Sequence, residues 1–416
     1  MVVFLVRWLI SVVTPPIENG AVAVQDGRIV AAGRRKDVVN AGGSGAEVRD
    51  LGDVVVIPGL VNAHTHLELS YLAESKPATA SYTGWVRDLL AKREGADAAV
   101  VRAAAEAAVQ TLSDNGVVAV GDVANEAWPA ALLARSSLHG IAFQEIYGFR
   151  PADAERILEE AAARLETIEA DPEVRGAAPR VTVALTPHAP QTCSPPLLKA
   201  LGGRAVASRE PLSIHLAESD DEVALFRDGT GPLAELLRER GAWDDAFHAP
   251  GLSPVEYLDR LGVLTPQTLA IHCVHVDHQD LSKLQARGVT VVTCPRSNDA
   301  LGVGRAPVPK ILSSGIPVAL GTDSLASAPD LDMFNEMAAL RSEHPTLSPA
   351  AVLRMATANG AKALGLSADL GTIDTGKLAL LAVIPLIEEG DDPLELVTSA
   401  PSIVTSLWRA EWEAEA

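Results

Sequence analysis

The chain has 416 residues, with 34 lysines and arginines against 54 aspartates and glutamates, which gives a formal net charge of -20. A surface of this charge repels nucleic acid and anionic membranes, so we expect neither as a partner and expect a small-molecule substrate instead. Hydrophobic residues make up 48% and charged residues 21%, which is typical of a globular protein and excludes a disordered or fibrous one.

Three cysteines, Cys193, Cys273 and Cys294, form no C-x-x-C pair, so the sequence indicates neither a disulfide framework nor a thiolate metal cage. The apolar run over residues 1–13 is interrupted by Arg7, is too short to span a bilayer and precedes no A-x-A-like cleavage site. We therefore expect a cytoplasmic protein, and a homo-oligomer stays open.

Short β-branched runs separated by turn residues fill the first part of the chain, for example AVAVQ, an Asp-Gly turn and RIVAAG. The run GTIDTGKLALLAVIPL near the other end is strand-like again. We predict a small composite β domain, whose N-terminal part covers residues 1–57 and whose C-terminal part covers residues 371–416.

Between these parts, over residues 58–370, apolar runs alternate with Ala-, Leu- and Glu-rich helical stretches, the signature of βα units. The fold class is therefore α/β, with a (β/α)8 TIM-like barrel, because eight is the closure number of that barrel. The expected strands are LVNAHTH, VVAVGDV, IAFQEIY, VTVALTPH, LSIHLAE, TLAIHCVH, VTVVTCP and PVALGTDS.

The connection over residues 227–264, between the fifth and sixth expected strands, is longer than a simple crossover helix. Long insertions at the C-terminal rim of a barrel commonly form lids or specificity walls. A plain surface helical hairpin is the alternative.

Four candidate metal ligands lie at expected strand ends, where barrel enzymes place their catalytic side chains. His64 and His66 are two residues apart, so their side chains face the same way, and His215 and Asp323 end two further strands. Singly, each residue is explained as strand-end polar surface, a core histidine or a helix cap. Together, three imidazoles and a carboxylate are a normal ligand set for zinc or another first-row divalent ion.

Two further residues are candidates for proton transfer. His272 ends the sixth expected strand, and Glu218 lies three positions after His215. His272 and Asp323 are placed to accept a proton from an activated water, and Glu218 to carry protons between water and substrate. A buried hydrogen-bonded histidine and a solvated glutamate are the structural alternatives.

The motifs PGLVNAHTHLE, TPHAPQTCSPP, IHLAESDDE, IHCVH, TCPRSN and LGTDS resemble the amidohydrolase superfamily. The resemblance is to the branch of guanine, cytosine and S-adenosylhomocysteine deaminases and chlorohydrolases, most nearly the 6-aminodeoxyfutalosine deaminases. It implies the same metal ligands and the same proton-handling roles for Glu218 and His272. VTVALTPHAP lacks the lysine that bridges two metals in binuclear members, so one ion is expected, with zinc as first candidate and iron or manganese as alternatives.

Four residues are candidates for substrate contacts, and the resemblance supports one of them, His188. His188 and Glu68 are candidates for sugar hydroxyls, whereas Arg150 and Arg87 are candidate clamps for a carboxylate. Each has a structural alternative: a loop histidine, a helix-capping glutamate and surface arginines.

The predicted function is metal-dependent hydrolytic deamination of an aminopurine nucleoside. The first candidate is conversion of 6-aminodeoxyfutalosine to futalosine and ammonia in menaquinone biosynthesis. The alternatives are deamination of S-adenosylhomocysteine, adenosine or guanine, a triazine-type chlorohydrolase, and a noncatalytic barrel scaffold.

Overall fold

The computed structural model describes residues 1–43, 45–73, 81–386, 392–399 and 406–407. Its contacts divide the chain into two compact units. Unit 1 comprises Met1–Asn62, Gln110–Ala119 and Asp332–Ala416, and unit 2 comprises Ala63–Val109 and Val120–Leu331. The predicted domain boundaries at 57/58 and 370/371 stay a prediction.

Unit 1 contains a seven-stranded sheet that joins strands from both ends of the chain. Its order is β15-β14-β5-β1-β2-β3, with β4 paired to β1. β5 and β14 run antiparallel with Ile57 opposite Ala382, so the strand-like run near the C-terminus does return to the N-terminal strands. The strands are β1 (Val2–Leu9), β2 (Ile17–Gln25), β3 (Arg28–Arg34), β4 (Glu47–Asp50), β5 (Val54–Pro58), β14 (Leu381–Pro385) and β15 (Ser406–Leu407).

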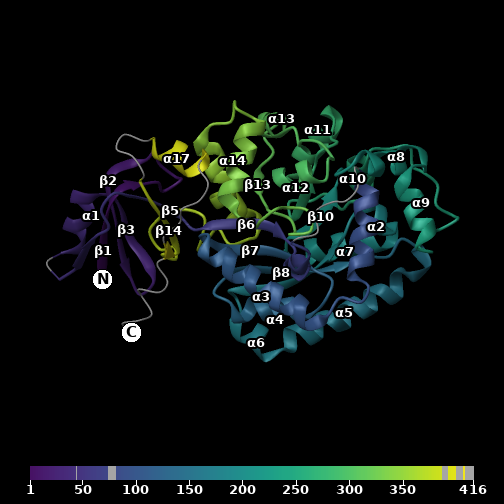
Figure 1. Cartoon of the computed structure of the whole chain (residues 1–416), viewed down its shortest axis with the longest axis horizontal. Coiled ribbons are helices and arrows are strands. Elements are labelled where there is room, and N and C mark those ends of the chain that lie inside the picture. Colours follow the sequence, from purple (N-terminus) through teal and green to yellow (C-terminus); the bar gives the residue numbers. More distant parts are fainter. Residues whose placement is uncertain (44, 74–80, 387–391, 400–405, 408–416) are drawn as a thin grey trace. The chain divides into compact units, whose positions relative to one another are not determined.

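Side chains along a strand alternate between the two faces of a sheet, so the continuous apolar runs of these strands make both faces apolar. Phe4, Val6 and Val22 pack on one face, whereas Val3 and Ala21 pack on the other together with Val38 of α1. Figure 1 shows α1 lying beside β1 and β3. The helical segments of unit 1 are α1 (Arg35–Gly42), α14 (Met333–Glu343), α15 (Pro349–Arg354), η4 (Met355–Asn359), α16 (Gly360–Ala363) and α17 (Pro393–Ser399).

All eight strands predicted for the barrel are present, in two four-stranded sheets. The ladders β8–β9, β10–β11, β11–β12 and β12–β13 are parallel. These strands are buried along most of their length, which explains their continuous apolar runs. They are β6 (Leu60–Thr65), β7 (Val117–Ala124), β8 (His139–Ile146), β9 (Val181–Pro187), β10 (Leu212–Leu216), β11 (Thr268–His272), β12 (Thr290–Thr293) and β13 (Val318–Leu320).

Hydrogen bonds also join the two sheets at strand ends. The amide of His215 donates to the carbonyl of His188 at 2.9 Å, and the amides of Thr322 and Asp323 donate to the carbonyl of His64 at 3.1 and 3.0 Å. Gly321 permits the second approach, because a Cβ there would lie only 2.8 Å from the His64 carbonyl oxygen. Residues far apart in the sequence are thereby brought to one place.

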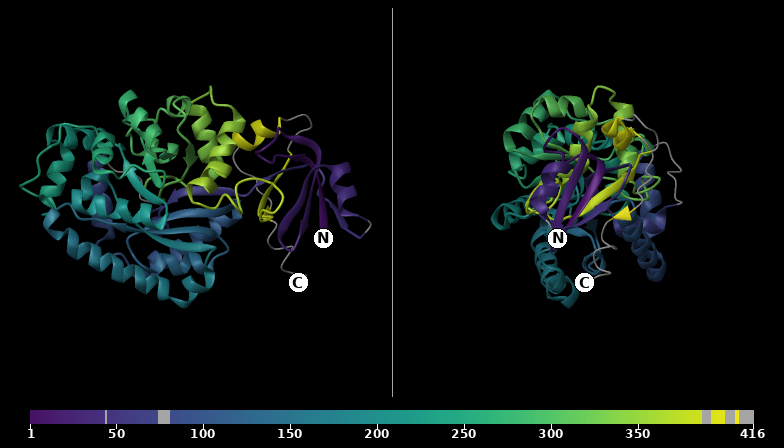
Figure 2. Two further views of the ribbon diagram at one scale, coloured as in Figure 1. Left: turned by 180° about the vertical axis from the view of Figure 1, so that it is seen from behind. Right: turned by 90° about the vertical axis from the view of Figure 1, so that its left-hand side faces the viewer.

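Helices follow most of these strands and lie outside them, as Figures 1 and 2 show. Local signals fix several ends: Ser219 caps α8 through the amide of Glu222, and Gly229 ends it in a left-handed conformation. The helices are α2 (Tyr82–Arg93), α3 (Ala98–Asp114), α4 (Trp128–Arg135), α5 (Ala154–Ala170), α6 (Pro172–Ala177), α7 (Pro195–Ser208), α8 (Asp220–Asp228), α9 (Pro232–Glu239), α10 (Pro254–Leu261), α11 (His278–Arg287), α12 (Pro295–Ala300) and α13 (Val308–Ser313), with short turns η1 (Leu67–Leu72), η2 (Pro151–Asp153) and η3 (Pro190–Thr192).

Among the described residues, none of the helices has both the length and the apolar character needed to cross a bilayer.

Candidate metal centre and active site

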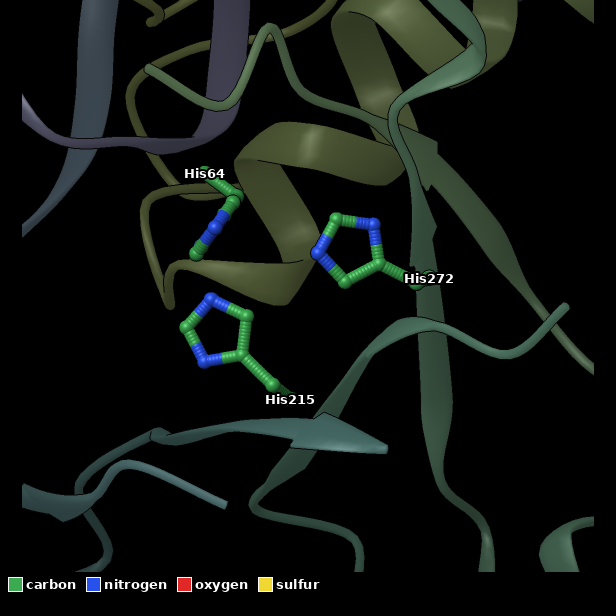
Figure 3. Close-up of side chains that lie close together, drawn as sticks. All are labelled: His64, His215 and His272. Carbon is green, nitrogen blue, oxygen red and sulfur yellow. The ribbon is translucent and has the colours of Figure 1, made fainter. Parts of the chain in front are cut away.

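Histidines from three different strand ends meet in the interior of unit 2. Figure 3 shows the rings of His64, His215 and His272 pointing toward one another. The ring centre of His64 lies 5.0 Å from that of His215 and 6.0 Å from that of His272. The His66 ring lies 4.8 Å from His64. The four imidazoles therefore form one cluster.

Asp323 supplies the carboxylate of this cluster. Its Oδ1 lies 3.6 Å from His64 Nε2 and 3.5 Å from His66 Nε2. Its other oxygen, Oδ2, accepts hydrogen bonds from Ser297 at 2.6 Å and Ser327 at 2.9 Å. The two serines leave Oδ1 directed at the histidines.

The donor set fits a divalent cation. The sets His64, His66, Asp323 and His64, His215, His272 each bring their candidate ligand atoms within 4.8 Å of one another. Burial lowers the pKa of His64 to about 3, so its imidazole is neutral at neutral pH, as a metal ligand must be. Burial alone raises the pKa of Asp323, but a hydrogen bond with His64 and the nearby His66 and His272 hold it well below its ordinary value.

Hydrogen bonds fix which nitrogen of two histidines faces the cluster. His215 donates from Nδ1 to the carbonyl of His188 at 3.0 Å, which leaves Nε2 as its free nitrogen. His272 donates from Nδ1 to the side-chain oxygen of Asn298 at 2.9 Å. The Nε2 atom of His272 therefore faces the cluster, buried and without a hydrogen-bond partner among the described residues.

Glu218, the other residue for which the sequence suggested a role in proton transfer, lies beside this nitrogen. Its Oε1 is 3.6 Å from His272 Nε2, and its Oε2 accepts a hydrogen bond from the Tyr82 hydroxyl at 2.7 Å. The buried carboxylate of Glu222 accepts the amides of Ala217 and Glu218 at 3.0 and 2.9 Å. This clamp holds the turn that carries Glu218, in which Ala217 has a φ of 51°.

A cavity of about 240 Å³ lies beside the cluster. One side is formed by polar groups at strand ends, including His66, His188, His215, Glu218 and Asp323. The other side is formed by two helices and is largely apolar. Its residues are Tyr82, Trp85, Val86, Leu89, Leu90 and Arg93 of α2, Leu236 and Leu237 of α9, and Arg240. Part of the insertion over residues 227–264 therefore forms a wall of the cavity.

The predicted sugar contacts and the predicted carboxylate clamps are placed differently. Glu68 and His188 line the cavity, whereas Arg87 and Arg150 are not among its lining residues. Arg87 forms a bidentate ion pair with the exposed Glu239. Arg150 donates to the backbone carbonyls of Gly241 and Trp243.

The sequence interpretation missed the arginines that do line the cavity, Arg93 and Arg240. Arg93 pairs with the buried Glu68 at 3.3 Å. Neither arginine belongs to a motif or a strand end, so the sequence carried no signal for them.

A polar network at the end of β8 was also missed. Glu145 accepts hydrogen bonds from Tyr147 and from Asn125, the latter at 2.8 Å. Burial alone raises the pKa of Glu145, but His188, His215 and His66 bring it down to about 2. Its position at an expected strand end was the signal that would have identified it.

Comparisons with known proteins identify the relatives of this chain. Residues 55–410 match the model of the amidohydrolase family. The chain is 34% identical over 382 residues to a 5-methylthioadenosine/S-adenosylhomocysteine deaminase of Syntrophobacter fumaroxidans, covering 88% of this chain and 80% of that protein. It is also 34% identical over 366 residues to an aminodeoxyfutalosine deaminase of Deinococcus radiodurans, covering 83% and 81%.

Two solved structures share the fold. One is a Helicobacter pylori aminofutalosine deaminase in complex with methylthio-coformycin, with a TM-score of 0.82, 22% identity, and coverage of 95% of each chain. The other is a zinc-bound adenosine deaminase from Xanthomonas campestris, with a TM-score of 0.81, 24% identity, and coverage of 98% of this chain and 91% of that one. The chain belongs to the amidohydrolase family and is a hydrolytic deaminase.

Proposed function

We propose that this protein deaminates an aminopurine nucleoside with the help of one divalent metal ion. The observation that carries the proposal is the juxtaposition of the buried His64, His66, His215 and Asp323 with the acceptor His272 and the carboxyl of Glu218. Intact ligands together with intact proton-handling groups count against a noncatalytic scaffold.

A closed (β/α)8 barrel is the architecture that we propose for the eight strands. Supporting observations are the hydrogen bond from His215 to His188 and those from Thr322 and Asp323 to His64, which join the two sheets at both seams. A closed barrel directs the carboxyl ends of all eight strands to one face, as this site requires.

His64, His66, His215 and Asp323 are the residues that would hold the ion, with zinc as first candidate and iron or manganese as alternatives. Such an ion, when bound, acidifies water and polarises the substrate. A third set of candidate ligands, Glu145, His188 and His215, also lies within 4.8 Å. His215 Nδ1 already donates a hydrogen bond to the His188 carbonyl, so only its Nε2 is left to bind an ion. Because His215 cannot then bind two ions, the third set favours one ion over two.

The chain's own residues carry the protons. His272 Nε2 and Asp323 accept one proton of the attacking water and return it to the amino group, which leaves as ammonia. Glu218 carries the other proton of that water to the ring nitrogen next to the amino-bearing carbon. The product from an adenine ring is the corresponding hypoxanthine.

For the substrate we propose 6-aminodeoxyfutalosine first, which would place the enzyme in menaquinone biosynthesis. Glu68 and His188 are placed for sugar hydroxyls, and the apolar residues of α2 and α9 suit an apolar or aromatic substituent on the sugar. Arg93 and Arg240 are the cavity arginines for an anionic group, in place of Arg87 and Arg150.

S-adenosylhomocysteine, 5-methylthioadenosine, adenosine and 5'-deoxyadenosine are the competing substrates, because relatives of this chain include deaminases named for several of them. Guanine deamination and triazine dechlorination are more distant alternatives. The cytoplasmic location and the oligomeric state stay predictions.

Ammonia release from a panel of these compounds, measured on one metal-loaded preparation, tests the proposal. We expect the highest kcat/KM for 6-aminodeoxyfutalosine and about one ion per chain by metal analysis. Equal kcat/KM for adenosine or guanine would mean that the enzyme does not recognise the substituent on the sugar and is a general aminopurine deaminase. Two tightly held ions per active site would overturn the assignment of a single metal ion.

A further inference from the structure

Three side chains of α2 make polar contacts with three separate parts of the active site. The Tyr82 hydroxyl donates to Glu218 Oε2 at 2.7 Å, and the Trp85 indole donates to the carbonyl of Ala326 at 3.1 Å. Arg93 pairs with Glu68. The first contact reaches the proposed proton carrier.

The ring of Tyr82 is held by packing that does not depend on its hydroxyl. It packs against the cluster of Leu225 and Leu236 and also against that of Val274 and Leu301. The Trp85 ring centre lies 6.0 Å away. Removing only the hydroxyl should therefore leave the ring and helix α2 in place.

The Tyr82 hydroxyl acts as a donor in this contact. Burial first, and then the carboxylate of Glu218, raise its pKa well above the ordinary value, so it remains protonated at any working pH. A carboxylate oxygen can only accept from it.

This contact makes the two oxygens of Glu218 different. Oε2 is occupied by Tyr82, whereas Oε1 faces His272 Nε2 at 3.6 Å. The terminal torsion of a glutamate is otherwise broad and roughly two-fold, so an unrestrained carboxyl would place its proton on either oxygen.

We propose that Tyr82 is a positioning residue whose hydroxyl holds Oε2 of Glu218, so that the transferred proton resides on Oε1, the oxygen facing His272 and the reacting atoms. The inference rests on the proposed shuttle role of Glu218 and adds to it the atom that carries the proton. Oε1 takes the proton from water and gives it to the ring nitrogen, and the O–H bond of Tyr82 stays intact throughout.

The first experiment compares Tyr82→Phe with Tyr257→Phe, using the substrate that the parent enzyme hydrolyses fastest. Tyr257 is a matched control because its ring is also packed, 4.6 Å from Phe226, but it does not line the cavity. We expect Tyr82→Phe to lower kcat about tenfold, with KM within about twofold, as for loss of one hydrogen bond to a charged group. Metal content and Tm should not change, and Tyr257→Phe should behave as the parent.

The second experiment repeats Tyr82→Phe in a Glu218→Gln background, with single-turnover measurements at excess enzyme. If Tyr82 acts through Glu218, its loss costs nothing more there. An equal fold loss in both backgrounds, an unchanged kcat, or a rise in KM alone would each overturn the proposal.

The proposed function and this proposal fail in different ways. A parent enzyme that is inactive on aminopurine nucleosides but active on another compound would refute the proposed substrate. Failure of the proposal for Tyr82 appears only in the ratio of kcat between Tyr82→Phe and the parent.

Discussion

The two sides of the cavity are built by different means. On the strand side, His215 is fixed by a hydrogen bond from Nδ1, and Asp323 by two serines. On the helical side, α2 and α9 contribute mostly apolar side chains, and Tyr82 and Arg93 of α2 are polar exceptions. We therefore expect substitutions on the strand side to act mainly on the chemistry, and substitutions of the apolar residues on the helical side to act mainly on substrate choice.

Removing a ligand from the strand side should have the largest effect. We expect His66→Ala to lose both metal and activity, with kcat at least about 1,000-fold lower, because the ion and its Lewis acidity are lost together. Metal analysis and ammonia release on the same preparation check this. Retention of a full complement of metal with normal turnover would remove His66 from the ligand set.

Glu218→Gln should separate chemistry from metal binding. The variant keeps the shape of the side chain but cannot carry a proton, so we expect unchanged metal content and kcat lower by at least about 100-fold. Steady-state kinetics with metal analysis measure both quantities. Near-normal turnover would show that the proton travels by another group.

A pH titration tests how buried the strand side is. Burial first lowers the pKa of His188 from 6.5 to about 4, so the unfolded chain binds this proton at a higher pH than the folded chain. Stability from this group is complete above pH 6.5 and falls as the pH drops toward 4, by at most about 3 kcal/mol.

Denaturant unfolding of the metal-free protein between pH 4 and pH 7 measures this dependence. His188→Gln should have a flatter profile than the parent. Identical profiles would mean that the imidazole of His188 is accessible to solvent protons in the folded protein.

The smallest effect is expected on the helical side. Arg93→Met removes the partner of Glu68, so we expect KM for nucleosides to rise about tenfold while kcat changes less. Arg135→Met, which breaks the exposed pair with Glu173, is the control and should match the parent. A larger rise in KM for Arg87→Met or Arg150→Met would indicate that the arginines predicted from the sequence bind the substrate instead.

The residues of the strand side could be predicted from the sequence because they lie at the ends of strands that have a regular apolar pattern. The eight expected strands are all present, and His64, His66, His215, His272 and Asp323, placed at their ends by counting, meet in one cluster. A period of two along a strand and the common edge of parallel strands determine such positions locally.

What only the tertiary structure decided lies on α2 and in its neighbours. Tyr82 and Arg93 reach Glu218 and Glu68 across 136 and 25 residues of sequence, from a helix that no motif marks. Arg87, on the same helix, points instead to Glu239. A helix presents every side of itself to some neighbour, so its packing partners determine which side chains enter the cavity, and no local pattern records that choice.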